Sequence, residues 1–126
     1  MDLIRTAGTF RAEGTQILFY PADGRNPVLV YNGSQRATAI LVCRGAIFTA
    51  FDGGGIYLSP DGQNLGGGGR TGRVYPGNQV ARKMVCDQGS GINGSNSVIT
   101  TFSGGGVYKS PDGNNLGGGG RTIRLN

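Results

Sequence analysis

The sequence has no histidine, no tryptophan and a single glutamate among its 126 residues. Without histidine, neither a Ser-His-Asp nor a Cys-His catalytic arrangement can form. The aspartates at 23, 61 and 112 fall in separate copies of a repeated turn, so a carboxylate pair at the spacing used by glycosidases is not expected from them. We therefore expect a protein that is not an enzyme and that carries no cofactor.

Cysteine is also scarce, with only Cys43 and Cys86. Two thiols without histidine do not make a zinc site, so no metal is expected. The segments Leu41-Val42-Cys43 and Met84-Val85-Cys86 match, which places the cysteines in equivalent core strands. We expect two buried thiols, with a disulfide as the alternative if the two strands meet.

Long apolar runs are missing as well. None reaches the roughly 18 residues that a membrane helix needs, so membrane insertion is not expected. The first residues show no basic stretch followed by an apolar one, which is the pattern of a secretory signal. These features predict a cytoplasmic protein or one secreted without a leader.

Glycine, in contrast, is abundant, with 26 residues. The Gly-X-Y period of collagen is absent. Apolar and β-branched residues gather in short runs such as Ile17–Tyr20 and Val28–Tyr31. Disordered chains have few such residues, so a folded chain is expected. No segment shows a sustained 3.6-residue apolar period, so we expect an all-β fold without helices.

An internal repeat dominates the chain. The segment Phe51–Val74 recurs at Phe102–Leu125, with 18 of 24 positions identical. A weaker third copy lies at Leu18–Asn26. Self-similarity of this kind means that one supersecondary unit is used several times.

The repeats divide the chain into three near-equal units. The Asp-Gly pairs begin at positions 23, 61 and 112, and the remaining distance through the two termini is similar. We therefore predict one domain over residues 1–126, made of repeats at about 1–38, 39–81 and 82–126, with a ring closed between the termini. The longer second spacing is explained by a polar loop inserted at Asp87–Ser97.

Each unit is predicted to contain about four short strands. In the second unit these are Ile40–Cys43, Ile47–Phe51, Gly55–Leu58 and Arg73–Tyr75. Ser59-Pro60-Asp61-Gly62 has the composition of a tight turn, in which the glycine adopts a positive φ. Twelve short strands in three units favour a pseudo-threefold β-trefoil. A β-prism and propeller-like blades completed by oligomerisation are the alternatives.

The glycine runs at 66–69 and 117–120 require a separate explanation, because the first repeat lacks one. They indicate a close approach of another backbone or of a ligand, or else a flexible loop. A phosphate-binding loop is excluded, since the Gly-Lys-Ser/Thr ending and the following helix are absent.

The repeated turns supply the candidate binding sites. Aspartate and asparagine side chains can bracket sugar hydroxyls, exposed glycine N–H groups can assist them, and tyrosine rings can stack on a sugar. Packing in the core is the alternative role for the tyrosines. The predicted ligand-binding residues are Asp61, Gly62, Asn64, Tyr57 and Arg70 in the second repeat, Asp112, Gly113, Asn115, Tyr108 and Arg121 in the third, and Asp23 and Asn26 in the first.

The net charge is +5, and most of the cations are arginines. Arg70, Arg73, Arg121 and Arg124 are repeat-equivalent and should recur on the same rim. They serve solubility or attract an anionic partner. Nucleic acid is not expected, because the basic residues are dispersed.

The layout of the repeats resembles that of three-fold β-trefoil and β-prism lectins, and this resemblance implies carbohydrate binding. We therefore expect a lectin-like module with repeated sites, whose partners are glycans, including acidic ones, and which can form homo-oligomers. A virion or coat component, or a protein-binding inhibitor module that uses the loop Asp87–Ser97, are the alternatives.

Overall fold

The computed structural model describes residues 8–43, 46–60, 62, 65–66, 71–75, 77, 79–87, 97–111, 116 and 122–125. They form antiparallel β-strands in three sheets, and none of these residues is helical. The predicted all-β class is confirmed. Within this part of the chain, no helix has the length and apolar character needed to cross a membrane.

Each sheet is a meander in which consecutive strands pair. The first contains β1 (Gly8–Glu13), β2 (Gln16–Pro21) and β3 (Val28–Asn32). The second contains β4 (Ala37–Cys43), β5 (Ala46–Phe51), β6 (Ile56–Ser59) and β7 (Gly72–Tyr75). The third contains β8 (Ala81–Asp87), β9 (Ser97–Phe102), β10 (Val107–Ser110) and β11 (Ile123–Arg124). The four strands predicted for the second unit are all present.

The turns of the first two units follow the predicted chemistry. Gly24 has a φ of 86° and its N–H donates to the carbonyl of Pro21 at 3.3 Å. Gly62 has a φ of 75° and its N–H donates to the hydroxyl of Ser59 at 3.0 Å. A positive φ favours glycine, because a Cβ would clash with the backbone.

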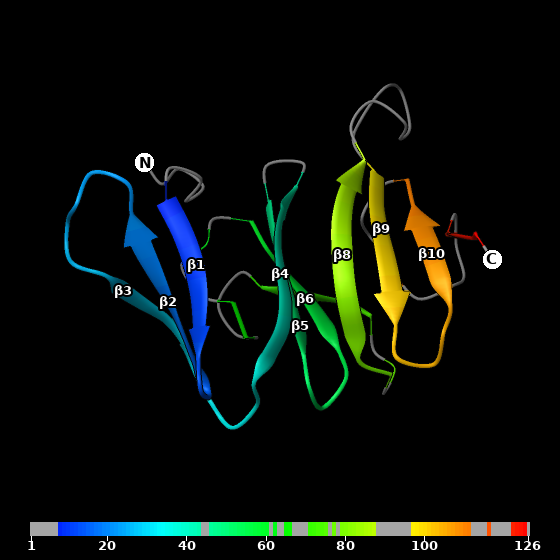
Figure 1. Cartoon of the computed structure of the whole chain (residues 1–126), viewed down its shortest axis with the longest axis horizontal. Helices are drawn as coiled ribbons and strands as arrows, with labels where there is room; N and C mark the ends of the chain where they lie inside the picture. The colour runs from blue at the N-terminus through cyan, green and yellow to red at the C-terminus, as the bar shows by residue number, and fades with distance from the viewer. Residues whose placement is uncertain are drawn as a thin grey trace.

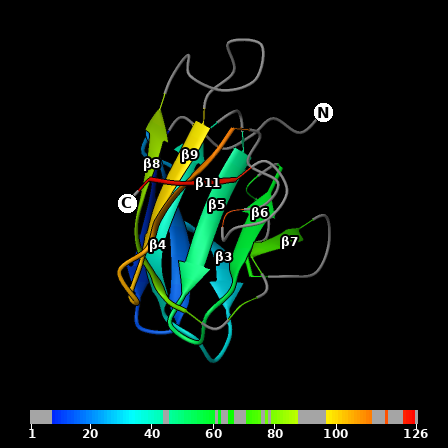
Figure 2. The ribbon, with the colours of Figure 1, turned by 90° about the vertical axis from the view of Figure 1, so that its right-hand side faces the viewer.

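The second sheet lies between the other two (Figure 1), and its strand β5 is buried along its whole length. The side chains of β5 alternate between two separate cores. Ile47 and Phe51 join the core shared with the first sheet, whereas Phe48 and Ala50 join the core shared with the third. The sheets are therefore stacked layers, and Figure 2 shows their strands lying over one another.

A β-trefoil or a β-prism would gather its three repeats around one central core. The described residues instead form two cores, one on each face of the second sheet. The predicted trefoil is not confirmed, and the layered order fits the blade-like alternative better. The first and third sheets lie at opposite ends of the stack (Figure 1), and no ring closure is seen among the described strands.

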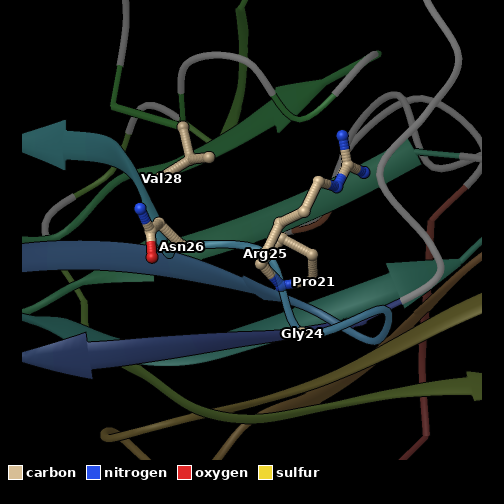
Figure 3. A pocket seen from close by; sticks show the side chains of 5 residues that line it. All are labelled: Pro21, Gly24, Arg25, Asn26 and Val28. Carbon is tan, nitrogen blue, oxygen red and sulfur yellow. The ribbon is translucent and has the colours of Figure 1, made fainter.

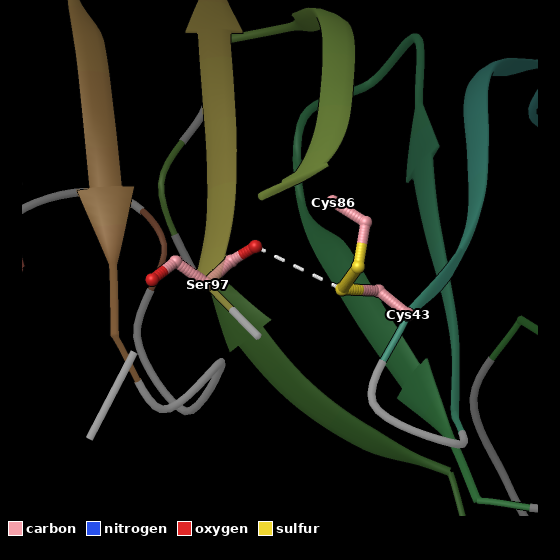
Figure 4. The surroundings of a disulfide bond; sticks show 3 residues. All are labelled: Cys43, Cys86 and Ser97. Atoms are coloured by element: carbon pink, nitrogen blue, oxygen red, sulfur yellow. Dashed lines mark hydrogen bonds between the residues drawn. A yellow bond between two sulfur atoms is a disulfide. The ribbon is translucent and has the colours of Figure 1, made fainter. Parts of the chain in front are cut away.

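The inner strands β4 and β8 are joined by a disulfide between Cys43 and Cys86, with Cα atoms 5.5 Å apart (Figure 4). The expectation of two free thiols is therefore wrong, and the alternative is correct. The Cys43 sulfur also lies 3.8 Å from the carbonyl oxygen of Ser97. At the other end of the strand, the Thr38 hydroxyl donates to the Ala81 carbonyl at 2.7 Å.

The two cysteines are not in equivalent positions, contrary to the sequence match. Ala46 and Ser97 are equivalent residues of the repeat. Ala46 pairs with Cys43, whereas Ser97 pairs with Asp87, so the structural equivalent of Cys43 is Asp87 and not Cys86. Cys86 is thus one residue out of register and projects from the opposite face of its sheet. Cys43 lies on the face of the second sheet that meets the third sheet. The equivalent face of the third sheet points out of the stack, so a cysteine has to project from the opposite face of that sheet to reach Cys43.

The two end faces of the stack carry charged residues where the inner faces do not. On the first sheet, Arg11 and Glu13 stand at the positions that Thr49 and Phe51 occupy on β5. On the third sheet, Lys83 and Lys109 stand at the positions that Ala39 and Leu58 occupy in the second sheet, as the strand pairing shows. Polar end faces are what stacked-repeat proteins need at their ends.

Candidate functional site

The structure describes five of the predicted ligand-binding residues: Tyr57, Gly62, Tyr108, Asp23 and Asn26. The others lie outside the described residues, namely Asp61, Asn64, Arg70, Asp112, Gly113, Asn115 and Arg121. Their proposed roles remain predictions.

Asp23 and Asn26 belong to the exposed turn between β2 and β3. The Asp23 carboxylate accepts a hydrogen bond from the Arg25 N–H at 3.1 Å and forms an ion pair with its guanidinium at 2.7 Å. Hydrogen bonds from Arg25 hold the pKa of Asp23 below its ordinary value of 3.8. Beside this turn lies an open groove of about 520 Å³ lined by Pro21, Gly24, Arg25, Asn26 and Val28 (Figure 3).

We call each interface between neighbouring sheets a joint. Tyr57 lies in the joint between the first and second sheets and is half-buried. Its ring meets that of Phe51 edge-on, with centroids 5.8 Å apart. The guanidinium of Arg73 lies over the Tyr57 ring, 5.6 Å from its centroid. The N–H at Nε of Arg73 also donates to the carbonyl of Tyr75 at 3.4 Å, which helps to fix the guanidinium.

Tyr108 repeats this geometry in the joint between the second and third sheets. Its ring meets Phe102 edge-on at 5.8 Å, and Arg124 lies over it at 5.7 Å. The predicted equivalence of Arg73 and Arg124 is thus confirmed, with one arginine at each joint. The two tyrosines also pack against core residues, so each has a structural role as well.

The strand pairing extends each of these pairs into a row of three side chains. Thr49 pairs with Tyr57, and Tyr57 pairs with Arg73. In the third sheet Thr100 pairs with Tyr108, and Tyr108 pairs with Arg124. We call these sets the Thr-Tyr-Arg rows; each runs from a buried hydroxyl to an exposed guanidinium.

The inner ends of the rows are unusual. The hydroxyl oxygens of Thr49 and Thr100 are buried, and neither has a hydrogen-bond partner among the described residues. Buried polar atoms are normally paired, so the same feature at the same place in both joints is a further sign that the two joints are built alike. Apart from their equivalence in the repeat, no sequence pattern distinguishes these threonines.

The first sheet lacks such a row. At the corresponding positions it has Arg11, Leu18 and Leu29, which pair in the same order. This face looks away from the second sheet and has no neighbouring sheet in the described structure (Figure 1). Among the described strands, the Thr-Tyr-Arg rows therefore occur only where two sheets meet.

In each joint, a tyrosine of the preceding sheet packs against the buried phenylalanine of the next sheet. The ring of Tyr31 lies 4.7 Å from that of Phe51, and Tyr75 lies 4.7 Å from Phe102. Tyr75 is 9% exposed, so it packs in the joint and offers no platform to a ligand. Tyr57 and Tyr108, in contrast, are half-buried.

Hydrogen bonds of glutamines and leucines also connect the sheets in both joints. The Gln35 N–H donates to the Tyr31 hydroxyl, and the Gln35 side-chain oxygen accepts from Gly53 N–H at 3.0 Å. Gln79, Tyr75 and Gly104 form the same set in the next joint. In addition, the N–H groups of Leu65 and Leu116 donate across the joints to the carbonyls of Val30 and Val74.

The described part of the first glycine run explains one of its glycines. A Cβ on Gly66 would lie 2.0 Å from ring carbons of Tyr31, so only glycine fits there. The group that approaches Gly66 is the side chain of a tyrosine in the preceding sheet, and not the backbone or the ligand that the glycine run had been expected to accommodate. The first repeat has no preceding sheet in the stack, which accounts for its shorter β2–β3 connection.

A further charged cluster lies on the outer face of the first sheet. Arg11 lies over the Tyr20 ring at 5.2 Å, and the Tyr20 hydroxyl donates to Glu13 at 2.6 Å. This hydrogen bond raises the pKa of Tyr20 above its ordinary value of 10.0. The cluster has an arginine on a tyrosine, as the joints do, but with a carboxylate beside it.

Comparison with models of protein families finds no match, and comparisons with curated proteins and with solved structures find none either. Function has to be inferred from the geometry.

Proposed function

We propose that this protein is a non-catalytic carbohydrate-binding module with one site at each joint between neighbouring sheets. The observation that supports the proposal is the Thr-Tyr-Arg row, which recurs with nearly the same geometry in both joints and is replaced in the first sheet. In each joint the arginine is exposed while the tyrosine beneath it is half-buried, so the pair lies at the border between the interface and the solvent.

The chemistry of the row suits a sugar. Sugars combine apolar ring faces with hydroxyl groups, and they bind to aromatic surfaces flanked by a few hydrogen-bonding groups. Tyr57 and Tyr108 provide the aromatic edge, and Arg73 and Arg124 provide donors. We expect Asp61 with Asn64, and Asp112 with Asn115, to line the same joints. Two weak sites in one chain gain avidity on a multivalent glycan.

A glycan array followed by titration calorimetry tests the proposal. We expect about two sites per chain, and one site in either Tyr57→Ala or Tyr108→Ala. Tyr20→Ala is the matched control, because Tyr20 also carries an arginine on its ring but lies outside the joints. Binding that is lost in Tyr20→Ala and kept in both joint variants contradicts the proposal, as does the absence of binding to every glycan.

An assembly role is a second candidate, favoured by one observation. Ile123 and Leu125, at the edge of the third sheet, are 58% and 49% exposed. Exposed apolar residues at a sheet edge promote association. Light scattering that shows a large assembly dispersed by Ile123→Lys, together with no glycan binding, would favour this role.

We also propose that the protein works in an oxidising environment and not in a reducing cytoplasm. The support is the Cys43–Cys86 disulfide, since such bonds persist outside the reducing cytoplasm. Thiol labelling of protein taken directly from its native setting should find both cysteines blocked. Labelling of both would contradict this.

A further inference from the structure

We propose that two copies of this protein associate through the outer faces of their third sheets and form a dimer with two-fold symmetry. This goes beyond the proposed function, because it concerns a surface that lies away from the joints. It depends on the apolar character of the face, on the placement of its charges, and on the contrast with the opposite end of the stack.

The outer face of the third sheet keeps a row of mostly aliphatic side chains. Val85 on β8 pairs with Ile99 on β9, which pairs with Lys109 on β10. Lys109 pairs in turn with Ile123 on β11, so the row crosses all four strands. Val85 and Ile123 are 40% and 58% exposed. Exposed apolar side chains that lie side by side mark a surface for interaction.

The equivalent row of the second sheet shows how such a surface is used inside the stack. There Leu41 pairs with Phe48, and Phe48 pairs with Leu58. All three side chains pack in the core that is shared with the third sheet. On the third sheet the row faces outward, and no further sheet lies beyond it in the described structure (Figure 1).

The charges on this face favour a second copy of the same face as its partner. Lys83 and Asp87 lie on β8, two residues to either side of Val85, and all three project from the outer face. When two such strands cross in opposite directions around an axis near Val85, Lys83 of each copy approaches Asp87 of the other. Asp87 keeps its present contacts, because a carboxylate can accept several hydrogen bonds.

Lys109 does not prevent this packing, although it belongs to the apolar row. Its ammonium group lies 3.6 Å from the carboxylate of Asp87 in the same chain. The charge is therefore drawn toward one end of the face, and the methylene chain of Lys109 remains over the row as apolar surface.

The opposite end of the stack offers no matching surface. A further joint would need an aromatic ring at the position of Phe51, where the first sheet has Glu13. It would also need the N–H that Leu65 donates across a joint. The repeat has Pro27 at that position, and proline has no N–H. Two like faces that meet around a two-fold axis instead form a closed dimer, which doubles the number of joints available to a multivalent ligand.

Sedimentation equilibrium of the full chain tests the proposal. Four strands about 4.8 Å apart make a face roughly 15–20 Å wide, which is small for an interface, so we expect a weak dimer whose mass reaches that of two chains only at high concentration. Val85→Lys should keep the protein monomeric. Val42→Lys is the matched control, because Val42 is also 40% exposed but lies on β4 of the second sheet, and it should leave the dimer intact.

A second pair of variants tests the charges without changing the apolar row. Lys83→Glu should weaken the dimer at least about tenfold, because it brings two carboxylates together across the axis. Lys83 is exposed, so this variant does not disturb the packing within the chain. Arg11→Glu makes the same change of charge at the other end of the stack and should leave the dimer unchanged.

Three results would overturn the proposal. The first is a monomer at every concentration. The second is a mass that rises beyond two chains and falls in Arg11→Glu, which would show that chains stack head to tail. The third is a monomer that binds vesicles of phosphatidylserine and phosphatidylcholine through Val85, which would assign the face to a lipid surface. Glycan binding is measured separately on the array, so a failure here leaves the proposed function intact.

Discussion

Removal of the Cys43–Cys86 disulfide should destabilise the protein strongly. The bond links residues 43 positions apart, and it joins the second sheet to the third. Restraining a loop of this length in the unfolded chain is worth about 4 kcal/mol in the chain-entropy model. The double variant Cys43→Ser with Cys86→Ser should therefore lose about that much free energy of unfolding.

Urea unfolding followed by tyrosine fluorescence measures this change, since the chain has no tryptophan. A matched variant tests the register shift. In Cys86→Val with Asp87→Cys, the new cysteine stands at the position equivalent to Cys43, on the outer face of the third sheet, where Asp87 pairs with Lys109 at 3.6 Å. This variant should not form the bond. An unchanged urea midpoint in the double serine variant, or a disulfide in the shifted variant, would refute this account of the stack.

Three further predictions address single joints and the first sheet. Phe51→Ala and Phe102→Ala should each cost about 3–5 kcal/mol in urea unfolding, because both rings are buried between two tyrosines; a cost in only one of them would show that the joints differ. Gly66→Ala should cost about 1–3 kcal/mol through its clash with Tyr31, whereas Gly72→Ala, which meets nothing within 4 Å, should not. Glu13→Gln should lower the pKa of Tyr20 toward 10.0 in an ultraviolet absorbance titration. Stability from this pair is present below pH 10 and is lost as the pH rises through the raised pKa; an unchanged pKa would show that Glu13 is not its cause.

The strands and turns could be predicted from the sequence because they depend on local patterns. The repeated Ser-Pro-Asp-Gly turn and the short apolar runs set the meander of each unit. The dipeptide Val30-Tyr31 also recurs in the sequence as Val74-Tyr75, and its tyrosines have equivalent partners in the two joints.

The packing of the units could not be deduced from their spacing. Equal spacing is compatible with a ring around one core and with a stack that has two. One signal was available in Ala46–Phe51, whose nearly continuous apolar run is typical of a strand buried on both faces. A strand with one face on a central core would alternate instead.

The candidate site was predicted in part for a similar reason. Tyr57, Tyr108, Arg73 and Arg124 lie in the repeat, so their equivalence was visible. That Tyr57 faces the sheet of another unit depends on the stacking direction, which no local pattern encodes. The disulfide was predicted only as an alternative, because a match of three residues does not fix the strand register to a single position.

Two like joints connect the three stacked sheets, and proton NMR can observe the ring contacts in both. Nuclear Overhauser contacts should connect the ring of Tyr31 with that of Phe51, and the ring of Tyr75 with that of Phe102, since both pairs of centroids are 4.7 Å apart. Each contact joins two different sheets. The absence of both contacts in a folded sample would contradict the stack and the binding sites placed in it.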